Sequence, residues 1–181
     1  MKIFFISDIH GSLSALKTAL DAFRREECSR IAILGDLMYH GPRNPLPDDY
    51  RPAEVASLIN GYKDRIIAVR GNCDSEVDQM LVEYPMMETY AQIAVGERTL
   101  FLTHGHVFGP DRLPPLRKGD ILAFGHTHIP LAQKADGIFL FNPGSVSLPK
   151  NGNPPSYGIF SGESLAVKRM DGTVLIETAL V

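Results

Sequence analysis

The sequence predicts an α/β fold in which two β-sheets pack against each other with helices on the outside. Two observations lead to this prediction. In the first half of the chain, short apolar runs alternate with segments of helical periodicity, which is typical of parallel strands joined by helices. In the second half, apolar runs follow one another closely with turn residues between them, which is typical of hairpins. Since the chain has 181 residues, 44% of them hydrophobic and 22% charged, we expect one globular domain over residues 1–181.

The first half has the pattern of a β-α-β-α-β series. Leu13, Leu16, Leu20 and Phe23 recur at the spacing of one helix face, so a helix is expected to begin at Leu13. A second helix is expected at residues 53–62. The predicted strands are short β-branched or apolar runs, residues 2–6, 30–34 and 65–69. Because strands joined by helices run mostly parallel, functional residues are expected on the loops at their carboxyl ends.

The second half contains closely spaced strand candidates. They are residues 90–95, 99–103, 121–124, 138–141, 157–160, 165–170 and 173–180. Gly96-Glu97, Asp136-Gly137 and Asp171-Gly172 supply the turns, since Gly and Asp adopt tight or left-handed conformations at little cost. The Pro-rich stretch 41–52 is too rigid and polar for a strand or helix interior, and we expect it to be an active-site loop.

Composition excludes several classes of protein. The formal net charge of -3 lacks the basic excess that nonspecific binding of nucleic acid or an anionic membrane needs, so nucleic acid is not a favoured partner. Residues 1–6 do not have the form of a signal peptide or anchor, and no segment reaches the ~20 apolar residues of a membrane span. The two cysteines, Cys28 and Cys73, are expected to be reduced thiols. We therefore expect a cytoplasmic protein, and a homo-oligomer is left open.

Five segments share one form, in which an apolar run is followed by polar residues that can bind a metal ion. In order, they are Asp8-Ile9-His10, Gly35-Asp36, Gly71-Asn72-Cys73-Asp74, Thr103-His104-Gly105-His106 and Gly125-His126-Thr127-His128. Five of the six histidines lie in these segments. Any one of them alone could be a turn, a helix cap or a surface residue. The ordered set of five favours a metal site.

The residue types indicate which ions would bind and what they would do. Imidazole together with carboxylate suits Mn, Fe, Co or Zn, whereas Mg prefers an oxygen-rich, hydrated site. Two divalent ions would bring about four positive charges, and Asp8 and Asp36 would return two, which leaves about two uncompensated. That surplus can hold a hydroxide and a phosphate, because bound metal ions lower the pKa of water to near neutrality. The pattern therefore predicts hydrolysis of a phosphate ester.

The five segments in this order resemble the signature of the calcineurin-like metallophosphoesterase superfamily over nearly the whole chain. The short length, Gly71-Asn72-Cys73-Asp74 and Asn142-Pro143-Gly144-Ser145 further resemble the small bacterial and archaeal phosphodiesterases of the YfcE type. The resemblance implies a four-layer α-β-β-α sandwich. It also implies two divalent transition-metal ions, with Mn2+ the expected ion and Zn, Fe, Co or Ni the alternatives.

The resemblance also implies the ligands of each metal ion. One ion would bind Asp8, His10, Asp36 and His128. The other would bind Asp36, Asn72, His104 and His126, so Asp36 would bridge the pair. Two ions bridged in this way lie roughly 3.5 to 4 Å apart, a spacing that clamps a phosphate between nucleophile and leaving group. For Asn72, the alternative is an ordinary Gly-Asn turn.

The expected activity is that of a phosphodiesterase, in which a metal-bound hydroxide attacks a small phosphodiester. Asp36, Asn72 and His106 are the expected catalytic residues, although His106 could equally be a hydrogen-bonding loop residue. His40, Arg43 and Cys73 are the expected substrate-binding residues. Cys73 stands where many superfamily members carry a His that contacts the leaving group, so a general acid is expected to be missing. A packing role for Cys73, a solvated Arg43 and a purely structural turn at residues 142–145 are the alternatives.

Two other functions compete with this one. A phosphomonoesterase or a nuclease of the same superfamily would use the same ligands and would differ in the loops over residues 39–51 and 106–116. A non-catalytic binding scaffold is the second alternative, because the retromer subunit with this fold resembles these enzymes. Scaffolds of that kind lack part of the ligand set, whereas this chain contains all seven candidate ligands.

Overall fold

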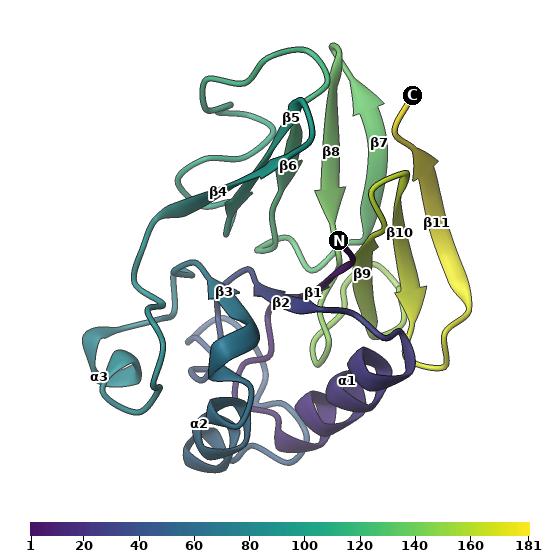
Figure 1. Ribbon diagram of the computed structural model, residues 1–181. Coiled ribbons are helices and arrows are strands. Elements are labelled where there is room, and N and C mark those ends of the chain that lie inside the picture. The colour runs from purple at the N-terminus through teal and green to yellow at the C-terminus, as the bar shows by residue number, and fades with distance from the viewer.

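The computed structural model describes residues 1–181 and contains two β-sheets packed face to face (Figure 1). The six-stranded sheet has the order β11-β10-β9-β1-β2-β3, and the five-stranded sheet has the order β4-β5-β6-β8-β7. The strands of the first sheet are β1 (Ile3–Ile6), β2 (Arg30–Ile33), β3 (Ile66–Ala68), β9 (Ser156–Phe160), β10 (Ser164–Arg169) and β11 (Val174–Ala179). Those of the second are β4 (Tyr90–Val95), β5 (Arg98–Thr103), β6 (Ile121–Ala123), β7 (Leu131–Ala135) and β8 (Ile138–Asn142).

The helices are α1 (Leu13–Arg25), α2 (Pro52–Asn60), the short α3 (Glu76–Gln79) and a 3-10 turn at Lys63–Arg65. Helices α1 and α2 cover the outer face of β1, β2 and β3 (Figure 1). Helix α1 begins at Leu13 because the Ser12 side chain accepts a hydrogen bond from the backbone N–H of Ala15, which caps the first turn.

Strand directions agree with the expected series. Strand β1 runs parallel to β2, and β2 runs parallel to β3, as expected for strands joined by α1 and α2. In the second sheet, β5, β6 and β8 are parallel neighbours, and β4 and β7 close the two edges as antiparallel hairpin partners. The carboxyl ends of β1, β2 and β3 therefore lie at one edge of their sheet, and those of β5 and β6 lie at one edge of theirs.

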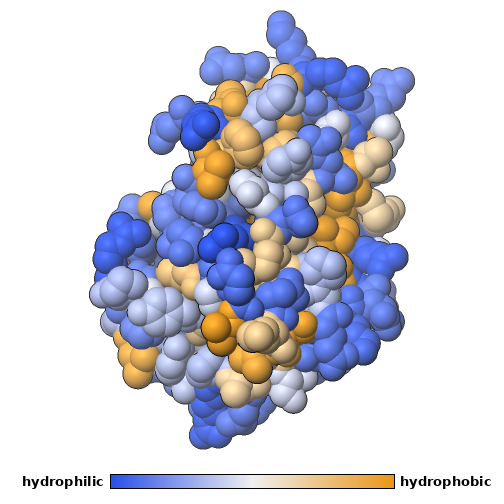
Figure 2. Space-filling view, turned by 90° about the vertical axis from the view of Figure 1, so that its left-hand side faces the viewer, coloured by the Kyte–Doolittle hydropathy of each residue, from blue (hydrophilic) through white to orange (hydrophobic).

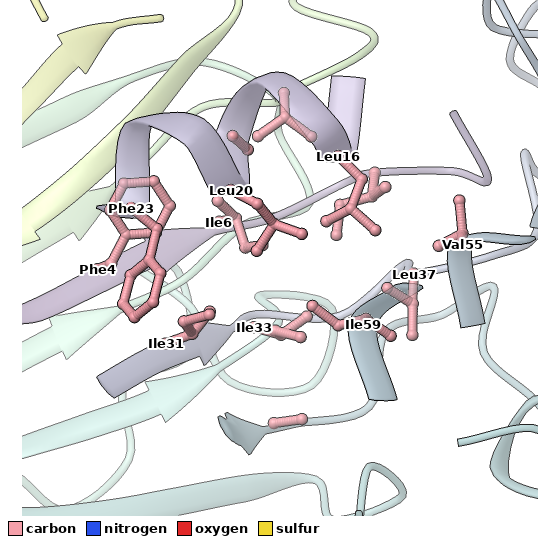
Figure 3. Packing of buried hydrophobic residues seen from close by; sticks show 14 of the residues in the cluster. Phe4, Ile6, Leu16, Leu20, Phe23, Ile31, Ile33, Leu37, Val55 and Ile59 are labelled. Carbon is pink, nitrogen blue, oxygen red and sulfur yellow. The ribbon is translucent and has the colours of Figure 1, made fainter. Parts of the chain in front are cut away.

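Strand β1 is buried on both faces, and its alternate side chains supply two separate cores. Phe4 and Ile6 pack under α1 and α2 with Leu16, Leu20 and Phe23 of the helix (Figure 3). Ile3 and Phe5 point the other way and pack between the two sheets. The Phe5 ring meets the Phe141 ring of β8 edge to face at 5.2 Å between centroids. This two-residue alternation fixes the spacing between the sheets.

The expected α/β class with two packed sheets and outer helices is confirmed, with one difference in the outer layer. The free face of the five-stranded sheet is covered by the loop of residues 104–120, which contains no helix. Phe108 and Leu116 of this loop pack on Phe101, Leu122 and Leu140 of the sheet. The loop contains three prolines, at positions 110, 114 and 115, and proline removes the N–H donor that a helix interior needs.

Each predicted strand and helix is present, with ends that agree within two residues. Besides the 3-10 turn, the structure contains two elements that the sequence pattern does not predict. Strand β7 is a short edge strand with Gln133 and Lys134 exposed, so it has little hydrophobic signal, and it follows a proline. Helix α3 has only four residues, too few for a hydrophobic period, and its one sequence signal is the capping box between Ser75 and Asp78.

A charged cluster joins the end of α1 to the sheet behind it. The Glu26 carboxylate accepts hydrogen bonds from Lys168 at 2.9 Å, from the Tyr157 hydroxyl at 2.8 Å and from Lys2 at 3.1 Å. Burial would raise the pKa of Glu26, but these three donors outweigh it and lower the pKa to about 2. The cluster therefore ties α1 to β9 and β10.

The surface is mostly polar, and none of the helices is long and apolar enough to cross a membrane. Figure 2 views the molecule from the side of α3 and shows a group of orange side chains in its lower half. The exposed apolar side chains of α3 and the residues just after it are Val77, Met80 and Leu81. Val77 also borders a groove that reaches Cys73, so this surface lies next to the polar cluster described below.

Candidate metal centre

The seven side chains predicted to bind metal come together from five strand ends. Each follows a strand by one to five residues: Asp8 and His10 follow β1, Asp36 follows β2, Asn72 follows β3, His104 follows β5, and His126 and His128 follow β6. Asp8, His10, His104 and His128 are buried, as is Asp36. Three of the strands belong to one sheet and two to the other, so the site lies where the edges of both sheets meet.

The seven side chains form two groups that share Asp36. In the first group, Asp8 Oδ1 lies 3.2 Å from His128 Nε2 and 3.8 Å from His10 Nε2. In the second group, His104 Nε2 lies 3.0 Å from Asn72 Oδ1 and 3.2 Å from His126 Nδ1.

Asp36 Oδ2 lies between the two groups. It is 3.7 Å from His10 Nε2 on one side and 3.5 Å from His104 Nε2 on the other. A single carboxylate oxygen therefore faces both sets of donor atoms. This is the position expected of a bridging ligand.

Backbone carbonyls orient three of the imidazole rings. Nδ1 of His10 donates to the Tyr39 carbonyl at 2.8 Å, Nδ1 of His104 to that of Leu34 at 2.6 Å, and Nδ1 of His128 to that of Leu148 at 2.6 Å. Because a carbonyl only accepts, the proton of each neutral ring is on Nδ1, and Nε2 turns its lone pair toward the centre. Hydrogen bonds from Nδ1 to a backbone carbonyl are typical of histidines that bind a metal ion through Nε2.

The backbone at these positions adopts an unusual conformation. Nine non-glycine residues have positive φ, and five of them are candidate ligands: Asp8 (54°), His10 (49°), Asp36 (53°), His126 (65°) and His128 (61°). The left-handed region costs a non-glycine residue on the order of 1 kcal/mol, although Asp and His tolerate it better than most. Strained backbone of this kind gathers at functional sites, where surrounding structure holds it in place.

Asp74 braces the loops that hold the second group. Its carboxylate accepts hydrogen bonds from the backbone N–H of Asp36 at 2.9 Å, of Leu37 at 2.9 Å and of Gly71 at 2.7 Å. Gly71 is required at this point, because a Cβ there would lie 2.1 Å from Asp36 Oδ1. Asp74 is buried and therefore serves the site from behind rather than facing substrate.

The Asn142-Pro143-Gly144-Ser145 segment braces the loops of the first group. The Asn142 side chain donates to the Gly125 carbonyl at 2.8 Å, and the Ser145 hydroxyl donates to the Asp8 carbonyl at 2.8 Å. Ser147 makes a further bond to the same carbonyl at 3.0 Å. These side chains are turned toward the backbone of the site, which agrees with a structural role for the segment.

The charges in the site are strongly coupled. Burial would raise the pKa of Asp36, but the hydrogen bond to His104 and the charge of that ring outweigh it, and the pKa lies well below the usual carboxyl range. Burial opposes protonation of His104, yet Asp36 and Asp8 together raise its pKa to about 9. Burial lowers the pKa of His10 and of His126. The site therefore holds two carboxylates that require positive charge nearby.

The donor atoms fit divalent cations. Asp8 Oδ1 is buried and has no hydrogen-bond partner, although burying a carboxylate oxygen without one is costly. His10 Nε2 and His128 Nε2 lie 3.3 Å apart, each on a ring whose Nδ1 donates to a carbonyl, so two lone pairs face each other. A cation between these atoms would satisfy all three. Imidazole, carboxylate and amide oxygen together suit first-row divalent ions.

A cavity of about 250 Å3 opens over the centre. Asp36, Asn72, His126 and His128 form its floor, and the predicted substrate residues Arg43 and Cys73 line it together with Gly41, Pro42, Asn44 and Lys150. Burial raises the pKa of the Cys73 thiol to about 12. The Pro-rich stretch thus borders the centre, as expected of an active-site loop.

The structure does not bring His40 to this cavity. The His40 ring packs edge to face against Tyr39 at 4.8 Å and against Tyr50 at 5.4 Å between centroids. Its backbone carbonyl accepts a bond from Asn44, so His40 supports the loop from behind. The expected contact between His40 and substrate therefore has no geometric support, because aromatic packing turns the ring away.

His106 lies next to the centre but outside the two donor groups. Its ring centroid is 5.3 Å from that of His104 and 6.2 Å from that of His126. It lines a neighbouring cavity of about 310 Å3 with Asn72 and Arg70. Burial lowers its pKa. His106 is therefore within reach of a substrate that extends past Asn72.

Sequence reasoning missed two residues of the site. The sequence does not indicate the role of Asp74, because only the fold shows which N–H groups its carboxylate meets. Lys150 lies in a turn rich in Pro, Gly and Asn, and nothing in that pattern indicates a cavity. It reaches the site because its backbone N–H donates to the His128 carbonyl at 3.2 Å.

Residues 1–164 match the calcineurin-like phosphoesterase superfamily domain. Phosphodiesterase YfcE of Escherichia coli strain K12 is 49% identical over 181 residues, which cover 99% of this chain and 98% of YfcE. The solved structure of this phosphoesterase from E. coli has a TM-score of 0.98 and 48% identity, and each chain is covered completely.

A solved structure of Vps29 from Entamoeba histolytica with Zn2+ is also similar, with a TM-score of 0.62, 21% identity and complete coverage of both chains. At that identity the likeness concerns the fold alone. It therefore gives no support to the scaffold alternative over the enzyme.

Proposed function

The chain belongs to the calcineurin-like phosphoesterase superfamily and is a phosphoric ester hydrolase, and we propose that it is a phosphodiesterase that works with two divalent metal ions. One observation carries this proposal: two groups of nitrogen and oxygen donors share the Asp36 carboxylate. The similarity to YfcE over almost the whole chain supports the choice of diesters, because the name of that protein describes a phosphodiesterase.

The two groups suggest two ions. Asp8, His10, Asp36 and His128 would hold one ion, and Asp36 with Asn72, His104 and His126 would hold the other. We propose Mn2+ as the resident ion, because a mixture of imidazole, carboxylate and amide donors suits it better than Mg2+. When bound, such ions lower the pKa of water and neutralise charge on a phosphate.

Three side chains at the two cavities are placed to contact the substrate. Asn72 lies on the cavity floor beside His104, where its side-chain amide can contact a phosphate oxygen as well as an ion. Arg43 borders the cavity and suits recognition of phosphate oxygens through its planar guanidinium. His106 would contact the part of the substrate that extends past Asn72.

Cys73 bears on the choice of leaving group. A thiol is a weaker acid than the imidazolium of a histidine, so Cys73 is a poor proton donor for a departing alkoxide. We therefore expect esters with acidic leaving groups to be cleaved fastest. Aryl methyl phosphates of graded phenol pKa would test this, and rates that do not depend on phenol pKa would contradict it.

The proposed function can be tested by resupplying metal ions to stripped protein. Bis(p-nitrophenyl) phosphate and p-nitrophenyl phosphate would be assayed with Mn, Co, Ni, Zn or Mg, beside His128→Ala. The expected result is metal-dependent cleavage that favours the diester and is lost in the variant. Faster cleavage of the monoester would favour a phosphomonoesterase instead. A folded protein that binds two ions without turnover of either ester would favour the scaffold.

A further inference from the structure

Two basic side chains at the mouth of the cavity have no partner within the protein. Arg43 and Lys150 both line the cavity over Asp36 and His128, and both are exposed. Neither takes part in an ion pair or donates a side-chain hydrogen bond, in contrast to Lys2 and Lys168. Lys17 and Lys118 also have no such partner, but they do not border this cavity. Arg43 and Lys150 are therefore free to meet a ligand.

The backbone beneath both side chains is fixed. Lys150 N donates to the His128 carbonyl at 3.2 Å, and His128 Nδ1 donates to the Leu148 carbonyl at 2.6 Å, so the segment 148–150 is tied to the centre. On the other side, Asn44 holds the loop around Arg43, with its N–H bonded to the Gly41 carbonyl at 3.2 Å. Each basic residue thus extends from a short, braced segment toward the same opening.

The charge balance of the site does not require these two cations when the substrate is a simple diester. The proposed pair of ions with Asp8 and Asp36 keeps about two uncompensated positive charges. A hydroxide and a simple diester bring one negative charge each, and together they balance that surplus. Arg43 and Lys150 add two more positive charges at the rim of a chain whose net charge is -3. They are therefore a local feature and not part of a generally basic surface.

We propose that Arg43 and Lys150 form a second anion site beside the scissile phosphate, which selects diesters that carry a further anionic group on one arm. The guanidinium of Arg43 would bind that group in two-pronged fashion, and Lys150 would act as a point charge. This inference rests on the proposed phosphodiesterase function and adds the substrate class to it.

The competing explanation is that both cations contact the scissile phosphate itself. In that case, removing either charge lowers turnover of every diester by the same factor. A second anion site predicts a larger loss for diesters with a charged arm than for those with a neutral arm. The ratio of the two rates, rather than either rate alone, separates the explanations.

The test uses three p-nitrophenyl phosphodiesters that differ in the second arm, which is propyl, 2-carboxyethyl or 2-phosphonoethyl. Each is assayed with Mn-loaded wild type and with Lys150→Met, which keeps side-chain length and removes the charge. Lys134→Met is the matched control, since Lys134 lies on β7 with its ammonium 5.1 Å from the Phe139 ring and does not line the cavity. Arg43→Met repeats the experiment at the other side of the mouth.

Wild type is expected to prefer each charged arm over propyl, and each variant should reduce that preference roughly fivefold, the effect of one charge at about 4 Å in water. The preference should also weaken between low salt and about 0.5 M salt, because salt screens exposed charges. Lys134→Met should leave it unchanged. A binding measurement adds a readout apart from turnover. Calorimetry gives the dissociation constants of 2-carboxyethylphosphonate and propylphosphonate, and each variant should change the ratio of these two constants by the same factor.

The outcomes separate this inference from the function on which it rests. Propyl ester turnover with no preference for a charged arm, or equal losses on all three esters in Lys150→Met, would overturn the anion site and leave the phosphodiesterase standing. No turnover of any ester with any ion would overturn the phosphodiesterase. A preference for the phosphonate over the carboxylate would identify the second group as a phosphate.

Discussion

Replacing Asp74 by Asn should show how much metal binding depends on the hydrogen bonds that hold the ligand loops, because it changes no ligand. The carboxylate accepts three backbone N–H groups, from Asp36, Leu37 and Gly71. An amide has one accepting oxygen. If that oxygen takes the place of Oδ2, the bonds from Asp36 and Gly71 remain in weaker, uncharged form, and the NH2 group faces the N–H of Leu37.

The size of the effect follows from these bonds. A buried donor left unsatisfied costs about 1–3 kcal/mol, and each remaining bond loses part of the extra strength that a charged acceptor gives. Asn also avoids the cost of burying a carboxylate, a cost visible in the raised pKa of Asp74 of about 6. The free energy of unfolding should therefore fall by about 1–3 kcal/mol. Metal affinity should fall by roughly 10- to 100-fold, as for other second-shell partners.

Urea unfolding of metal-free protein measures the first quantity, and calorimetric titration with Mn2+ measures the second. Asp78→Asn is the matched control, because Asp78 accepts from Ser75 N at 2.7 Å in the capping box of α3 and contacts none of the ligands. That control should lose some stability and keep wild-type affinity. If Asp74→Asn lost stability but bound two Mn2+ ions as tightly as wild type, the argument that Asp74 positions Asp36 would be wrong.

Three further predictions concern charge, backbone and metal. The pKa of Glu26 is lowered from 4.5 to about 2, so its contribution to stability is present above pH 4.5 and is lost as the pH falls toward 2. When the pH falls from 7 to 3, the free energy of unfolding of Glu26→Gln, measured with urea, should therefore decrease by about 1 to 3 kcal/mol less than that of wild type. Gly71→Ala should weaken binding of both ions, because the added Cβ would lie 2.1 Å from Oδ1 of the shared ligand Asp36, whereas Gly61→Ala, with 3.3 Å to the nearest atom, should bind both as wild type does by calorimetry. Mn2+ at about 100 times its Kd should raise Tm by about 10 to 20 °C through mass action, because each of the two proposed ions contributes about 2.7 kcal/mol, and His128→Ala should show a smaller rise in the same thermal scan.

Much of the fold could be predicted because the hydrophobic signal is local. The alternation of Phe4 and Ile6 with Ile3 and Phe5 marks a strand buried on both faces, and Leu16 with Leu20 marks a helix face. The outer layer over the second sheet could not be predicted in the same way. Its apolar contacts come from isolated residues in a Pro-rich loop, which have no period to detect.

The residues of the candidate site also differ in whether a local sequence pattern marks them. Asp8, Asp36 and His104 could be identified because each stands just after an apolar run, and the ends of parallel strands meet. The position of Lys150 at the cavity and the packing of His40 outside it could not be predicted, because contacts with residues distant in sequence place a loop side chain. The His40 ring faces Tyr50, ten residues further on, and Lys150 depends on a bond to His128.

Metal binding in this fold should be coupled to the packing of the two sheets. Each donor group takes residues from both: Asp8 and Asp36 belong to the first sheet and His128 to the second, and Asn72 belongs to the first and His126 to the second. Neither sheet alone supplies a complete group. A shift of one sheet relative to the other would separate Asp8 Oδ1 from His128 Nε2, now 3.2 Å apart, and would leave a buried carboxylate without positive charge. We therefore expect the contact between Phe5 and Phe141 in the core between the sheets to support metal binding as well as stability, because it helps to hold the two halves of each proposed metal site at a fixed separation.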